Sequence, residues 1–108
     1  MKIRERDIEN YLVRQVDKVG GKAYKFSSPG NRAVPDRICL FPFGKVIFVE
    51  LKAPGKTPTP LQYKIHNYMR ELSHTVLVID SKELVNLFVE SVRVAIQEKR
   101  KEVRNDVK

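Results

Sequence analysis

The spacing of apolar residues in the first half of the chain predicts one helix followed by three strands. The helix has apolar residues three or four positions apart and ends at a glycine pair: Ile8, Leu12, Val16, Val19, then Gly20-Gly21. Strands are expected at residues 22–27, 36–41 and 45–52, because these runs are rich in apolar and β-branched residues. Residues 42–44 form a tight turn, so the last two strands form a hairpin.

The second half of the chain predicts a helix, a strand and a further helix. Thr59 is a good N-cap, Pro60 suits the first helical position and Gln62 completes a capping box. A strand is expected at 75–79, after which Asp80 or Ser81 caps the last helix. The apolar side chains expected to be buried are Leu61, Ile65, Tyr68, Met69 and Leu72 in the first of these helices, and Leu84, Val85, Phe88, Val92, Ala95 and Ile96 in the last.

The resulting order, α-β-β-β-α-β-α, predicts an α/β fold with a mixed four-stranded sheet flanked by helices. One domain is expected at residues 1–96, and residues 97–108 are a charged tail that either extends the last helix or frays. No apolar run approaches the ~20 residues of a membrane span, and no signal peptide is recognisable. The single cysteine, Cys39, fits core packing in a reducing compartment.

The charge distribution indicates a polyanionic partner. The chain of 108 residues has a formal net charge of +8. Residues 18–64 hold nine basic residues and only two acids, so this segment carries +7 of that excess. Those two acids are Asp36 and Glu50. A generic basic surface is the alternative explanation, because net charge speaks to association and not to fold.

Glu50 and Lys52 end a hydrophobic strand where charged side chains are costly to bury. Alternation along the strand turns both to the same side, together with Val46 and Phe48. Asp36 opens the preceding strand. Two carboxylates with a lysine beside them are suited to hold Mg²⁺ or Mn²⁺ and to orient an attacking water.

Several short segments in order resemble the viral-type replication-repair nuclease (VRR-NUC) domain of the PD-(D/E)xK superfamily. They are Glu5-x-x-Ile8-Glu9-x-x-Leu12, Gly20-Gly21, Tyr24 to Gly30, Val34-Pro35-Asp36-Arg37, Val49 to Gly55 and Pro60-Leu61-Gln62. The resemblance covers about residues 5–79 and implies the restriction-endonuclease-like fold. Stand-alone chains of this size in that family are phage proteins, which implies action in the cytoplasm of a bacterial host.

The resemblance also assigns roles to individual residues. It implies that Asp36, Glu50 and the Leu51 carbonyl bind the metal, that Lys52 is the catalytic lysine, and that Glu9 is the first-helix acid, with Glu5 as second choice. Gln62 matches a glutamine near the site, although capping alone would explain it. Residues expected to reach DNA phosphates are Lys25, Ser27, Arg32, Arg37 and Lys56.

The implied function is a Mg²⁺- or Mn²⁺-dependent DNA endonuclease without a small-molecule cofactor. Small viral members of the family resemble Holliday-junction resolvases, which implies branched DNA as substrate and a homodimer. The apolar stripe of the last helix either provides the contact between copies or packs on its own domain. The alternatives are a flap or nicking endonuclease and a catalytically silent nucleic-acid-binding module. Only His66 and His74 are available for zinc, and neither has a partner at metal-ligand spacing.

Overall fold

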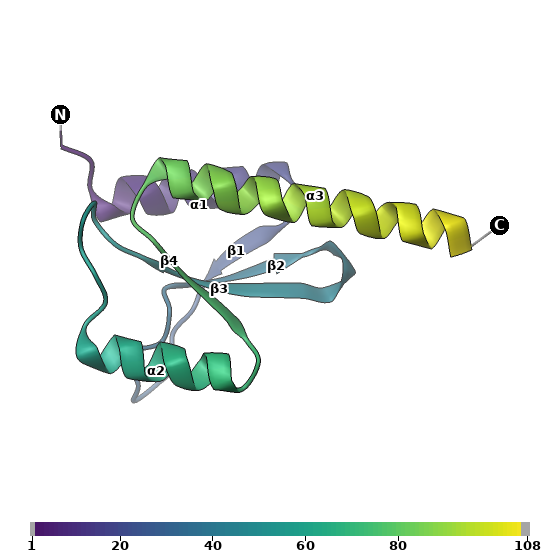
Figure 1. The fold of residues 1–108 in the computed structure, drawn as a ribbon. Coiled ribbons are helices and arrows are strands. Elements are labelled where there is room, and N and C mark those ends of the chain that lie inside the picture. Colours follow the sequence, from purple (N-terminus) through teal and green to yellow (C-terminus); the bar gives the residue numbers. More distant parts are fainter. Residues whose placement is uncertain (1, 107–108) are drawn as a thin grey trace.

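A mixed sheet separates two layers of helices (Figure 1). The computed structural model describes residues 2–106. Its elements are α1 (Glu5–Lys18), β1 (Lys22–Lys25), β2 (Arg37–Phe41), the 3₁₀ turn η1 (Pro42–Gly44), β3 (Lys45–Leu51), α2 (Pro60–Glu71), β4 (Thr75–Ile79) and α3 (Lys82–Asp106). The predicted order of helices and strands is therefore confirmed. Within these residues, every helix falls short of the length and apolar character that crossing a membrane requires.

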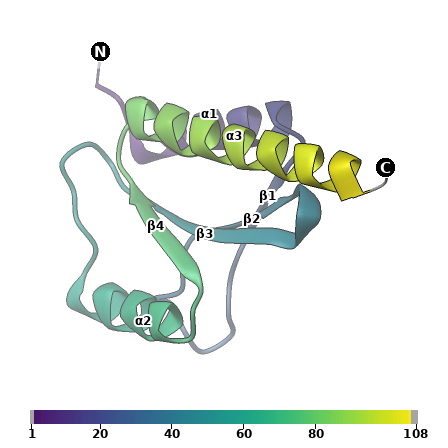
Figure 2. The ribbon, with the colours of Figure 1, turned by 45° about the vertical axis from the view of Figure 1, so that its right-hand side comes forward.

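The sheet has the strand order β1-β2-β3-β4. Strand β2 pairs antiparallel with β1, to which a loop at residues 26–36 joins it, and with β3, to which the short turn η1 joins it. Strands β3 and β4 are parallel, since α2 carries the chain back between them. Helices α1 and α3 lie side by side over one face of the sheet, and α2 covers the other, as both ribbon views show (Figure 2). The described part of the tail continues α3 as an exposed helix that projects beyond the sheet.

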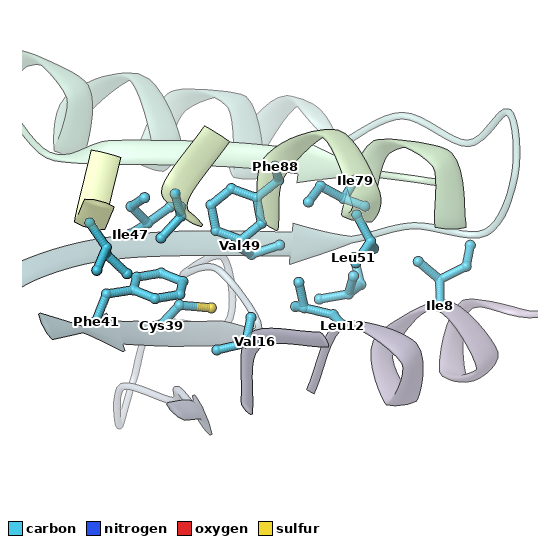
Figure 3. Close-up of a cluster of buried hydrophobic side chains, with 13 residues drawn as sticks. Ile8, Leu12, Val16, Cys39, Phe41, Ile47, Val49, Leu51, Ile79 and Phe88 are labelled. Carbon is cyan, nitrogen blue, oxygen red and sulfur yellow. The ribbon is translucent and has the colours of Figure 1, made fainter. Parts of the chain in front are cut away.

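The main hydrophobic core lies between the sheet and the α1–α3 layer (Figure 3). The odd-numbered residues of β3, Ile47, Val49 and Leu51, are buried there against side chains of both helices. Its other members are Ile8, Leu12, Val16, Cys39, Phe41, Ile79, Val85, Phe88, Val92 and Ile96. Since side chains alternate along a strand, the even-numbered residues of β3 face α2, and the predicted common side of Glu50 and Lys52 is confirmed.

Helix α2 differs from the sequence-based expectation in the face that it buries. Leu61, Tyr68 and Leu72 were expected in the core, but each is more than half exposed. The fully buried residue of this helix is His66. Ile65 and Met69, also expected in the core, are half-buried, so the apolar stripe is only partly covered. The sheet face beneath α2 carries Glu50 and Lys52, and the polar side chain of Gln62 contacts both.

Most of the apolar stripe of α3 packs on its own domain, although Leu84 and Ala95, also expected to be buried, are exposed. Val85, Phe88, Val92 and Ile96 are buried in the core, with the Phe88 ring edge-on to Phe41 at 5.9 Å. Ser81 caps the helix by accepting a hydrogen bond from the Leu84 N–H at 3.1 Å. These residues are therefore not free to form a contact between copies.

Both residues of the turn between α1 and β1 have to be glycine. Gly20 has a positive φ, and Gly21 lies against the backbone and side chains of β2. Gly20 has a φ of +86°, a conformation that glycine adopts without strain. A β-carbon on Gly21 would lie 2.8 Å from the Leu40 carbonyl oxygen and 2.6 Å from the Phe41 ring. The tight turn brings β1 directly onto β2, at the end of the sheet away from the charged residues.

Candidate active site

The register between β2 and β3 brings two carboxylates together. Arg37 lies opposite Val49 in this antiparallel pair, so Asp36 lies opposite Glu50, and opposite residues share a face. The Leu51 N–H donates to Asp36 Oδ2 at 2.8 Å, which fixes the aspartate on the backbone of β3. The Asp36 carbonyl accepts from the Phe26 N–H at 2.9 Å. Asp36 is thereby anchored from both sides.

The two oxygens of Glu50 have different surroundings. Its side chain is only 3% exposed. Oε2 lies 3.1 Å from Lys52 Nζ and accepts a hydrogen bond from Gln62 Nε2, also at 3.1 Å. Oε1 is buried without a hydrogen-bond partner, and the nearest basic atom is His66 Nε2, at 3.9 Å. Oε1 is therefore a buried oxygen that is free to act as a metal ligand or to accept a hydrogen bond.

The carboxylates strongly favour a positive charge beside them. Burial is the main cause that raises the pKa of Glu50 to about 7, with Asp36 adding to it and Lys52 opposing it. Burial also raises the pKa of Asp36, although the hydrogen bond from the Leu51 N–H lowers it. Two buried acids in close proximity resist ionisation unless a cation compensates them.

Gln62 caps α2 and also contacts two residues of the candidate site. Its N–H donates to Thr59 Oγ1 at 3.2 Å, and its Oε1 accepts from the Thr59 N–H at 2.9 Å, which completes the capping box. The same Oε1 accepts from Lys52 Nζ at 2.8 Å, while Nε2 reaches Glu50. The first turn of α2 therefore holds the lysine and the glutamate in place.

The two acids of α1 have different partners. Glu9 forms an ion pair with Arg37, with Oε2 accepting from Nε at 2.8 Å. Glu5 lies one turn closer to the helix N-terminus, where burial and then the charge of Asp36 raise its pKa while Lys52 lowers it. The sequence ranked Glu9 ahead of Glu5, whereas the geometry commits Glu9 to Arg37 and leaves Glu5 exposed beside the carboxylates.

The expected phosphate-contacting residues divide into two groups. Lys25, Ser27, Arg32 and Lys56 are exposed. Arg37 is not, because its guanidinium is 13% exposed and donates to Glu9 and to the Ala23 carbonyl, the latter at 2.9 Å. A surface hollow of about 550 Å³ adjoins Asp36, and its lining includes Ser27, Asn31 and Arg32. Of the two carboxylates, only Asp36 lines this hollow.

His66 belongs to the site although the sequence analysis considered it only as a zinc ligand. It is fully buried, one helical turn after Gln62, and faces the same glutamate. The four-residue spacing between Gln62 and His66 was the available signal, because residues four apart share a helix face.

The donor set suits a hard divalent cation that keeps water ligands. Across residues 2–106, no three His, Cys, Asp or Glu side chains gather closely enough to hold a metal ion by themselves. Asp36 and the unpartnered Oε1 of Glu50 supply two carboxylates, which is the number that Mg²⁺ typically takes from a protein. The remaining positions would be filled by water, a backbone carbonyl or substrate.

Comparisons with known proteins agree on the type of protein. The chain is 54% identical to a protein named "Putative nuclease p44" from Acyrthosiphon pisum secondary endosymbiont phage 1, over 85 residues that span 79% of this chain and 91% of that protein. A solved structure described as a VRR_NUC domain superimposes with a TM-score of 0.75 at 29% identity, covering 80% of this chain and 94% of that one. No protein-family model matches the chain.

Proposed function

Because the chain belongs to the viral-type replication-repair nuclease (VRR-NUC) family, we propose that it is a Mg²⁺- or Mn²⁺-dependent, structure-specific DNA endonuclease that resolves Holliday junctions. The observation that carries this proposal is that Asp36, Glu50 and Lys52 lie on one face of the sheet. Oε1 of Glu50 has no hydrogen-bond partner there. A protein that only bound DNA would gain nothing from two carboxylates, which repel phosphate unless a cation lies between.

In the proposed reaction, Asp36, Glu50 and the Leu51 carbonyl would hold the metal. The bound ion would lower the pKa of a water ligand and polarise the scissile phosphate. Lys52, held between Glu50 and Gln62, orients the attacking water and offsets the charge that develops on the phosphate. Water attacks phosphorus directly, and the bond to the leaving oxygen breaks without an enzyme-linked intermediate.

Glu5 is the better candidate for the first-helix acid. Its support is that the charge of Asp36 raises the pKa of Glu5 and the charge of Lys52 lowers it. Glu9 is half-buried and already paired with Arg37 through Oε2, whereas Glu5 is exposed. We therefore assign Glu5 to the metal, through a water molecule, and Glu9 to the orientation of Arg37.

DNA contact is assigned to the exposed cations around the site. Lys25, Arg32 and Lys56 are exposed, and Arg32 also lines the hollow beside Asp36. Phosphate contacts of this kind give affinity without base preference. A relative of the protein comes from a phage, which supports action on DNA in the cytoplasm of an infected bacterium.

Resolution of a four-way junction needs two symmetric cuts, whereas each chain offers one Asp36-Glu50-Lys52 set. A dimer of two chains related by a twofold axis is the simplest way to provide two such sets. The buried stripe of α3 cannot join them, but α2 exposes Leu61, Tyr68 and Leu72. Tyr68→Glu should give a monomer by light scattering, and Tyr24→Glu, on an exposed residue of β1, is the control.

A cleavage panel tests the proposal. Four-way junctions, flaps, splayed arms and plain duplex are incubated with Mg²⁺, Mn²⁺ or EDTA, using wild type, Asp36→Asn, Lys52→Ala and the exposed-residue control Lys64→Ala. Paired symmetric nicks in junctions that need metal, Asp36 and Lys52 are expected. Single cuts beside a flap would instead identify a flap or nicking endonuclease. Junction binding with no cleavage under any condition would identify a silent binding module.

A further inference from the structure

Three buried side-chain atoms without hydrogen-bond partners gather at one point of the described structure. They are Glu50 Oε1, His66 Nδ1 and His66 Nε2, and no other side-chain nitrogen or oxygen in residues 2–106 is both buried and unpartnered. Nε2 lies 3.9 Å from Oε1. An orphaned buried polar atom costs about 1–3 kcal/mol, so their clustering calls for a common explanation.

Packing alone does not explain a histidine at this position. His66 is 0% exposed, and an apolar side chain of similar volume would fill the same space without leaving two ring nitrogens unpaired. A neutral imidazole still offers one N–H donor.

Helix α2 places a side-chain nitrogen near each oxygen of Glu50. Gln62 Nε2 already donates to Oε2, and His66, one turn later, faces Oε1. An approach of roughly 1 Å would bring Nε2 into hydrogen-bond range of Oε1. A carboxylate oxygen has two lone pairs, so Oε1 would accept from the imidazole and still bind a cation.

We propose that His66 is a positioning residue whose Nε2–H donates to Glu50 Oε1 and fixes the plane of the carboxylate for the divalent metal. The proposal rests on the proposed function, since it takes Glu50 as a metal ligand. Hydrogen-bond partners of this kind commonly change metal affinity by about 10–100-fold. Gln62 and His66 would together prevent the carboxylate from rotating.

A matched pair of substitutions separates positioning from packing. In His66→Gln, the Nε2 donor is kept at nearly the same reach, whereas His66→Met keeps the length and removes the donor. Mn²⁺ affinity is measured by electron paramagnetic resonance, and the melting temperature is measured without metal. His66→Met should bind Mn²⁺ about tenfold or more weakly with an unchanged or higher melting temperature, and His66→Gln should stay within about threefold of wild type. In a Glu50→Gln background, His66→Met should cause no further loss.

Any of these other outcomes would overturn the proposal that His66 positions Glu50. Wild-type affinity in His66→Met, or equal loss in both variants with a lower metal-free melting temperature, would leave His66 a packing residue. Nitrogen coupling to bound Mn²⁺ that disappears in His66→Met would make it a direct ligand. If wild type and Glu50→Gln bound Mn²⁺ equally weakly, the metal site itself would fail and the inference with it.

Discussion

Substitution of Glu50 by glutamine should stabilise the metal-free protein at alkaline pH. Burial, then the charge of Asp36, raises the pKa of this carboxyl to about 7 in the folded chain, against 4.5 for an ordinary glutamate. Glutamine has nearly the same shape, and its amide oxygen can still accept from Lys52 and Gln62. The substitution therefore removes the unfavourable ionisation while keeping the contacts of Oε2.

The direction of the pH effect follows from the raised pKa. Between pH 4.5 and about 7 the folded state holds more protons than the unfolded state, so the free energy of unfolding falls as pH rises. The contribution is fully present below pH 4.5 and lost above about pH 7. At about 1.4 kcal/mol per pKa unit, the loss amounts to about 3 kcal/mol by pH 8. Asp36 contributes in the same direction.

Urea denaturation from pH 5 to 8.5 in EDTA measures this effect in wild type, Glu50→Gln and the exposed-carboxylate control Glu71→Gln. The control should follow wild type, and Glu50→Gln should match both near pH 5 but exceed them by about 3 kcal/mol at pH 8. Mn²⁺ at a hundred times its Kd should add about 2.7 kcal/mol to wild type at pH 8 and much less to Glu50→Gln. Parallel pH profiles for wild type and Glu50→Gln would refute the argument.

Three further predictions concern the first helix, the DNA interface and the glycine turn. Glu5→Gln should slow single-turnover cleavage at saturating Mn²⁺ more than Glu9→Gln, and the reverse order would return the metal-facing role to Glu9. The slope of log K for junction binding against log salt should be about −3 or steeper, and Lys56→Ala should reduce it by about 1, whereas a flat response would turn the basic segment away from DNA. Gly21→Ala should lower the free energy of unfolding by about 1–3 kcal/mol, because its β-carbon meets the Leu40 carbonyl, and urea denaturation that found no loss would contradict the contact.

The hydrophobic pattern of β3 was enough to predict how its residues divide between the two faces of the sheet. Its even and odd positions separate charged ends from core residues, so the common face of Glu50 and Lys52 follows from the period of two. Hairpin pairing with β2 then places Asp36 opposite Glu50. These features depend on local pattern and register, both of which are encoded in short stretches of sequence.

Features that depend on how a helix is placed against the sheet were harder to predict from the sequence. Helical periodicity groups Glu5 and Glu9 on similar faces, but it does not say how far α1 extends past the ends of the strands, and that offset decides which acid meets Arg37. In α2, the apolar stripe was the reasonable candidate for burial. The helix instead turns its Gln62–His66 side inward, because burying Glu50 requires polar partners more than the stripe requires cover.

The double use of Gln62 ties the geometry of the candidate site to a helix end. One amide group closes the first turn of α2 and also holds Lys52 and Glu50. Helix ends open in local fluctuations far more often than a core strand such as β3 unfolds. Fraying of this single turn would release the lysine while the rest of the fold stays intact. Activity should therefore be lost on heating before global unfolding, with early hydrogen exchange at the amides of residues 62 and 63 as its signature.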